Sequence, residues 1–186
     1  MCKLNCKSYF FFLALLLFIS PSCDKISDRL DTFTQFEMDL DQTITIPASS
    51  KAQLPFNITT PDIETDSESS FAVNNSRKDL VEEVTLTKLQ LTLSSPENGD
   101  FGFLKSIAVY VGAGDLPEVK IAWKDSISED AGKILELEVT GVDLQEYIKK
   151  EAINLRVNTV TDELLTSDHV IDLHTVFYVD VKVLGN

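Results

Sequence analysis

Cysteine, histidine and basic residues are scarce in this chain. Its 186 residues include 3 Cys, 2 His and 1 Trp, and 16 Lys and Arg stand against 30 Asp and Glu. The cysteines lie at positions 2, 6 and 23, so no disulfide can form within the part that follows Cys23. The burial of apolar side chains must therefore stabilise that part.

The excess of acidic residues argues against nucleic acid as a partner. The formal net charge is −14 at pH 7, and residues 1–22 contribute Lys3 and Lys7 but no acid, which leaves −14 − 2 = −16 for the remainder. Such a surface repels phosphate backbones and anionic lipid headgroups.

Motifs that define catalytic sites are missing from the sequence. It contains no G-x-S-x-G, H-E-x-x-H, phosphate-loop or dinucleotide-binding fingerprint. The two histidines, His169 and His174, lie in one stretch of alternating residues with opposite parity. They should face opposite sides of a strand and cannot hold a metal together. We therefore predict that the protein is not an enzyme and uses no cofactor or metal.

The first 23 residues determine where the protein works. Lys3 and Lys7 precede an apolar run at residues 9–19 (YFFFLALLLFI), which a Ser-Pro-Ser triplet and Cys23 follow. The run has about 11 residues, whereas a helix that crosses a bilayer needs about 20. A basic start, a short apolar segment and small residues are typical of a cleaved secretion signal, here residues 1–22.

Cys23 adds a more specific feature. With it, the segment resembles a bacterial lipoprotein signal, in which the cysteine is acylated and the peptide is cut before it. Ser22 suits the position before the cysteine, whereas Ser20 and Pro21 differ from the usual Leu-Ala/Ser pair. Ser20 and Ser22 also fit an ordinary signal peptidase, and the alternative to lipidation is a free thiol on a frayed end. The resemblance implies a lipid anchor at Cys23, which holds firmly when two or three acyl chains are attached.

The residues after Cys23 form the predicted tether, residues 23–32. The resemblance implies a place in the cell envelope, with the outer membrane favoured. Asp24 directly after the cysteine is similar to an inner-membrane retention signal of enteric bacteria. Nearby acids are also similar to a surface-export signal of Bacteroidota-type lipoproteins, so the periplasmic and surface sides both stay open.

From residue 33 onward, apolar and polar residues alternate. The alternation is clear over residues 36–46, 54–58, 84–94, 107–111, 119–123, 135–139, 153–157 and 171–183. Period two is typical of half-buried strands. We predict that residues 33–186 form an all-β, antiparallel, immunoglobulin-like β-sandwich of about eight strands with short helical connections. The pattern resembles the envelope sandwich domains of many Bacteroidota lipoproteins.

Three aromatic residues are candidates for contact with a ligand. Trp123 invites a sugar-binding interpretation, but its parity matches that of Val119 and Ile121, which predicts burial. Tyr110 and Tyr178 have the outward parity of their strands and are candidates for an exposed platform. A separate candidate is the acidic segment 61–70, where calcium binding is the alternative to a solvated loop. The loop is favoured because the glycine of a tight calcium loop is absent.

Three functions agree with these features. A protein-binding or structural module tethered to the envelope needs only the anchor and the sandwich, and would show an exposed apolar patch or an unpaired edge strand. A glycan-binding module would show coplanar aromatic rings on one open face. A pilin-like subunit would lend the strand at residues 170–184, which should then lie at an edge. We expect the first.

Overall fold

The computed structural model describes residues 35–48, 54–65, 69, 71–72 and 76–182. All of them belong to the unit Thr34–Asn186. The predicted signal peptide, Cys23, the tether and part of the acidic segment 61–70 lie outside the described residues, so those predictions stay predictions. No helix among the described residues is long and apolar enough to cross a membrane.

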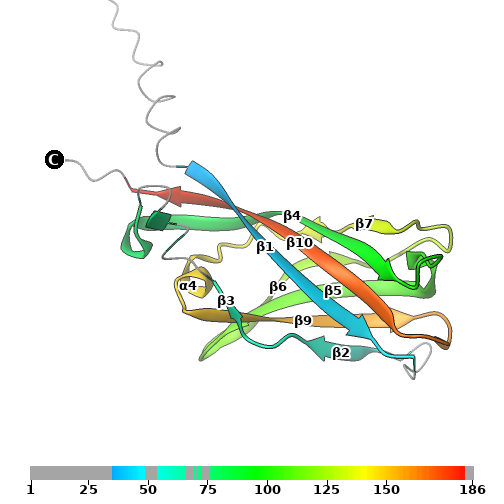
Figure 1. The fold of residues 1–186 in the computed structure, drawn as a ribbon. Coiled ribbons are helices and arrows are strands. Elements are labelled where there is room, and N and C mark those ends of the chain that lie inside the picture. The colour runs from blue at the N-terminus through cyan, green and yellow to red at the C-terminus, as the bar shows by residue number, and fades with distance from the viewer. Residues whose placement is uncertain (1–34, 49–53, 66–68, 70, 73–75, 183–186) are drawn as a thin grey trace, which may run out of the picture. The chain divides into compact units, whose positions relative to one another are not determined.

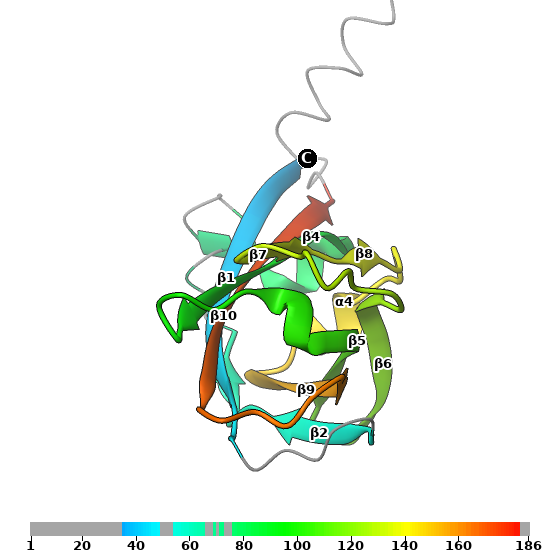
Figure 2. The same cartoon turned by 90° about the vertical axis from the view of Figure 1, so that its right-hand side faces the viewer.

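Two antiparallel sheets pack face to face (Figures 1 and 2). The first, called sheet 1 below, has the order β1-β10-β4-β7. Its strands are β1 (Gln35–Ile46), β4 (Val81–Ser95), β7 (Ile134–Glu136) and β10 (His169–Val181). The long strand β10 pairs with β1 on one side and with β4 on the other.

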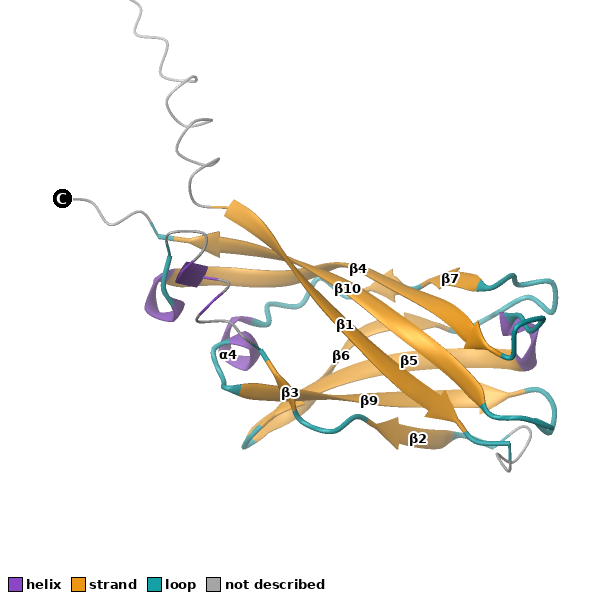
Figure 3. Cartoon of the chain, viewed as in Figure 1, coloured by secondary structure: helices purple, strands orange, loops and turns teal. Residues whose placement is uncertain are grey.

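The second sheet, called sheet 2, has the order β2-β9-β5-β6-β8. Its strands are β2 (Phe56–Thr59), β5 (Leu104–Ala113), β6 (Leu116–Lys124), β8 (Glu138–Val139) and β9 (Ala152–Thr161), and the short β3 (Ile63–Glu64) also pairs with β9. Helical pieces are short, as Figure 3 shows: η2 (Lys78–Leu80), η3 (Phe101–Phe103) and α4 (Gln145–Ile148).

The all-β, antiparallel sandwich with short helical connections is therefore confirmed. The strands outnumber the predicted eight partly because one predicted strand, residues 135–139, divides between the sheets. Its first part, β7, pairs with β4 in sheet 1, and its second part, β8, pairs with β6 in sheet 2. Leu137 lies between β7 and β8, where the chain passes from one sheet to the other, and its backbone N–H donates to Leu89 O over 3.0 Å.

The core lies between the sheets and follows the predicted alternation. Leu89 and Leu91 of β4, Val109 of β5 and Val157 of β9 are completely buried. Each such side chain contributes about 1.5–3 kcal/mol when it leaves water. Phe101, next to the turn after β4, is also 0 % exposed and belongs to the same core.

Candidate ligand-binding face

Trp123 lies on the outer face of sheet 2, not in the core, so the prediction of its burial is wrong. The cause is a bulge in β6. Val109 pairs with Ala122 and Tyr110 pairs with Lys120, so Ile121 is an extra residue in the ladder. A bulge places two residues of one strand opposite a single residue of its neighbour, which reverses the parity beyond it.

The burial of β6 agrees with this register. Ile121 and Ala122 are consecutive and both fully buried, whereas Trp123 is partly exposed. Trp123 pairs with Ala108, an outward residue between the buried Ile107 and Val109. The exposed ammonium of Lys120 lies 5.1 Å from the centroid of the Trp123 ring.

Tyr110 is a diagonal neighbour of Trp123 on the same face. It lies two residues beyond Ala108 on β5, and its direct partner on β6 is Lys120. On the other side, Tyr110 pairs with Arg156 of β9, whose guanidinium carbon lies 4.0 Å from the centroid of the tyrosine ring. Diagonal pairs in a sheet are about 7–8 Å apart, within reach of aromatic side chains.

Arg156 connects Tyr110 to a hydrogen-bonded polar row. Its Nε donates to Glu118 Oε2 of β6 over 2.6 Å, and its Nη1 donates to Asn57 Oδ1 of β2 over 2.9 Å. Asn158 Nδ2 donates to the same Asn57 oxygen, also over 2.9 Å. The side chain of Arg156 is 25 % exposed, and these bonds, which lie at the surface, hold the guanidinium in place. The polar row, the two aromatic residues and Lys120 together form a surface that we call the aromatic-amide face. Its residues are Asn57, Tyr110, Glu118, Lys120, Trp123, Arg156 and Asn158.

The third predicted aromatic residue lies elsewhere. Tyr178 is part of β10 and pairs with Glu37 and Thr85, on the outer face of sheet 1. The sandwich core therefore separates it from Tyr110 and Trp123. Two of the three predicted ligand-facing residues are brought together, and the third is not.

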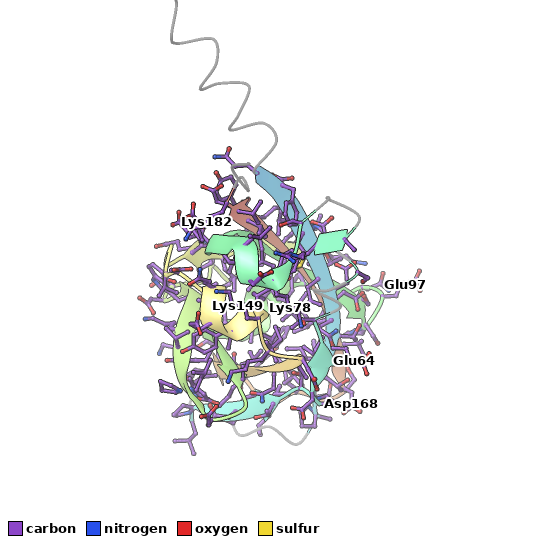
Figure 4. The ribbon with its side chains drawn as sticks, turned by 90° about the vertical axis from the view of Figure 1, so that its left-hand side faces the viewer. Glu64, Lys78, Glu97, Lys149, Asp168 and Lys182 are labelled. Atoms are coloured by element: carbon purple, nitrogen blue, oxygen red, sulfur yellow. The ribbon has the colours of Figure 1, made fainter. Side chains whose placement is uncertain are left out.

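The outer face of sheet 1 is acidic. Its carboxylates come from all four strands: Glu37, Asp39, Asp41, Glu83, Glu136, Asp172 and Asp180. The hydroxyl of Ser94 and then that of Thr43 donate to the Asp172 carboxylate and lower its pKa below the ordinary value. Figure 4 shows further charged side chains, such as Glu97 and Lys182, at the periphery.

Both histidines have the orientations that their parity predicts. His174 faces outward, and its Nδ1 lies 2.7 Å from Asp41 Oδ1, in a depression of about 530 Å³. His169 is 9 % exposed and packs against Phe103, with the centroids of the two rings 4.2 Å apart. Its Nδ1 forms a hydrogen bond with Ser167 O. It lines a second depression, of about 390 Å³, whose rim carries acidic side chains: Asp100, Glu129, Asp162 and Glu163. Within the described residues, no group of three or more ligand side chains is placed to hold a metal ion.

The edges of the sheets bear on the other predicted functions. The strand proposed as a donor is β10, and its pairing on both sides contradicts the expected edge position. The long edge strand of sheet 1 is β1, which pairs with β10 alone in the described sheet. The most exposed large apolar side chains that the structure describes, Leu54, Ile134 and Leu164, come from three separate segments, as is common on protein surfaces.

Comparisons with known proteins add little to this description. No family model matches the chain, and no curated protein matches it. Among solved structures, one from Desmodium yellow mottle tymovirus is 12 % identical with a TM-score of 0.29, covering 81 % of this chain and 92 % of that one. Another, from turnip yellow mosaic virus, is 10 % identical with a TM-score of 0.26, and the match covers 81 % of this chain and 98 % of that one. Likenesses this distant carry no argument about function.

Proposed function

We propose that the protein is a lipid-anchored, non-catalytic binding module of the cell envelope, with the outer membrane favoured. The anchor rests on the sequence, where a short secretion signal ends directly before Cys23. The binding role rests on the aromatic-amide face. There four neighbouring strands of sheet 2, from the edge strand β2 to β6, hold a hydrogen-bonded polar row beside two aromatic rings. Side chains fixed on regular strands are pre-organised for contact.

The non-catalytic part of the proposal rests on the sequence, which contains none of the catalytic motifs named above. Among the described residues, His174 bonds to a carboxylate and His169 to a backbone carbonyl, and neither bonds to a hydroxyl. The exposed acidic side chains of sheet 1 contribute solubility and repel polyanions.

The anchor is tested by membrane fractionation of cells that produce the full chain. We expect the wild type to sediment with membranes and to incorporate labelled palmitate, and the Cys23→Ser variant to do neither. Cys6→Ser is the matched control, because that cysteine lies in the predicted signal and is removed with it. Membrane association and labelling of Cys23→Ser at wild-type levels would contradict the anchor.

The binding role is tested by affinity capture from detergent-solubilised membranes. The wild-type chain is compared with Arg156→Met, which removes the centre of the polar row. We expect envelope material that the wild type retains to be lost with the variant. Equal capture by both chains would contradict the assignment of the aromatic-amide face.

A further inference from the structure

The aromatic-amide face has the chemistry of a saccharide site. We propose that it binds a neutral polysaccharide, with pyranose rings stacked on Tyr110 and Trp123 and hydroxyl groups bonded by the neighbouring polar row. This inference rests on the proposed binding function and gives the class of ligand. It also rests on the pairing of Trp123 with Ala108, which places the two rings on one face of sheet 2.

The aromatic rings supply the apolar part of such a site. The faces of a pyranose ring carry C–H groups, which pack against the electron-rich face of an aromatic ring. Tyr110 and Trp123 lie on adjacent strands and on one side of the sheet, so a single extended chain can contact both. Arg156 lies over one face of the Tyr110 ring and Lys120 over one face of the Trp123 ring, so the pyranose rings stack on the faces that these cations leave uncovered. The N–H groups of both cations can donate to sugar oxygens.

The polar row supplies alternating donors and acceptors. Asn57 Oδ1 accepts from both Arg156 and Asn158, which orients the Asn57 amide so that its two N–H groups point elsewhere. Glu118 uses Oε2 for Arg156, and its second oxygen has no hydrogen bond to a described residue. Sugar hydroxyls both donate and accept, so a row that offers both kinds of group suits them.

Charge selects a neutral ligand. On this face, Arg156 is paired with Glu118, and Lys120 lies over Trp123 with Glu138 as the strand neighbour of that tryptophan. The local charges therefore nearly cancel, while the chain as a whole carries −14 and repels an anionic polymer. A protein partner usually needs a larger patch with an apolar centre, whereas here charged groups flank two partly buried rings.

The test is affinity electrophoresis of the full chain in detergent, in native gels that contain hydroxyethylcellulose, xylan, mannan or soluble starch. We expect at least one of these polysaccharides to retard the wild type. Tyr110→Ala and Trp123→Ala should each weaken the retardation about tenfold or more, since an aromatic contact contributes on the order of 1.4 kcal/mol, which is a factor of ten. Tyr178→Ala is the matched control on the opposite face and should bind as the wild type does.

A second variant protects the test against misfolding. Asn57 is exposed on the short strand β2, so Asn57→Ala, which loses two exposed hydrogen bonds, should stay folded with only a small fall in melting temperature and still weaken binding. Wild-type chain that no polysaccharide retards, or equal losses in Tyr110→Ala and Tyr178→Ala, would overturn the proposal. Capture of an envelope protein through the same face, with no retardation by polysaccharide, would overturn the saccharide inference and leave the binding module intact.

Discussion

The two outer faces of the sandwich come from the same kind of sheet but differ in chemistry. Sheet 1 presents carboxylates on every strand, and its side-chain contacts are exposed to water: the hydrogen-bonded side chains of His174 and Asp41 are 42 % and 77 % exposed. Sheet 2 presents two aromatic rings beside a polar row, and Arg156 at its centre is 25 % exposed. Exposed pairs contribute little to stability or recognition, whereas partly desolvated and stacked groups contribute more. This difference is the reason why we propose the outer face of sheet 2, and not that of sheet 1, for contact with a ligand.

Deletion of Ile121 is expected to have the largest effect. It removes the extra residue and one fully buried side chain, and should cost about 2–5 kcal/mol in urea denaturation. After the deletion, Ala122 should still pair with Val109 and Trp123 with Ala108, so Trp123 should remain outward. Acrylamide should then quench its fluorescence as strongly as in the wild type. Ile121→Ala keeps the bulge and should cost a similar amount. If deletion made Trp123 much more accessible to quencher, the described register would be wrong.

Replacement of Arg156 by methionine compares the two faces directly. Arg156→Met loses two hydrogen bonds and the stacking on Tyr110, and should lower the free energy of unfolding by about 1–2 kcal/mol. Lys88→Met on β4 is the control on the outer face of sheet 1, and a surface change of that kind stays within about 0.5 kcal/mol. Equal effects in the two variants would remove the energetic difference between the faces.

Charge reversal should have opposite signs on the two faces. Glu83 lies opposite Asp180 in sheet 1, so Glu83→Lys replaces a like-charge pair with an attractive one and should stabilise by about 0.5 kcal/mol. Glu118→Lys in sheet 2 places a cation beside Arg156 and should destabilise by about 1 kcal/mol. Urea denaturation at low salt measures both changes, and high salt should shrink them. A gain in stability from Glu118→Lys would contradict the role given to its pair with Arg156.

The smallest expected effect concerns Asp172. Hydrogen bonds from Ser94 and then Thr43 lower its pKa in the folded state below the ordinary 3.8. The resulting stabilisation is present above that ordinary value and is lost as pH falls through the lowered pKa. Because the group is exposed, Asp172→Asn should cost about 0.5 kcal/mol or less at pH 7, and nothing in strong acid. Denaturation measured across pH 2–7 checks this, and a cost that stays constant over this range would contradict the account.

The strands were readable from the sequence because burial on one side imposes strict alternation. In β10, for example, each residue from Ile171 to Val181 with the parity of Phe177 is buried. Trp123 was misplaced because a bulge breaks that rule without a proline or glycine to mark it. The available signal was Ala122, a small apolar residue where the alternation called for a polar one.

The polar row could not be predicted by periodicity. Arg156 meets Glu118 and Asn57 across sequence separations of 38 and 99 residues, and only the order of strands in sheet 2 brings them together. The division of residues 135–139 between the sheets was hidden for a similar reason, because alternation does not tell which sheet a strand joins. Side-chain pattern determines which face is buried, and the pairing of distant strands determines what the other face carries.

The most direct test of the outward position of Trp123 uses its own fluorescence, since the chain contains 1 Trp. Acrylamide quenching of the native protein should be clearly measurable, weaker than in the urea-unfolded chain, and reduced when a bound polysaccharide covers the ring. Native fluorescence that acrylamide barely quenches would place Trp123 in the core and contradict the aromatic-amide face.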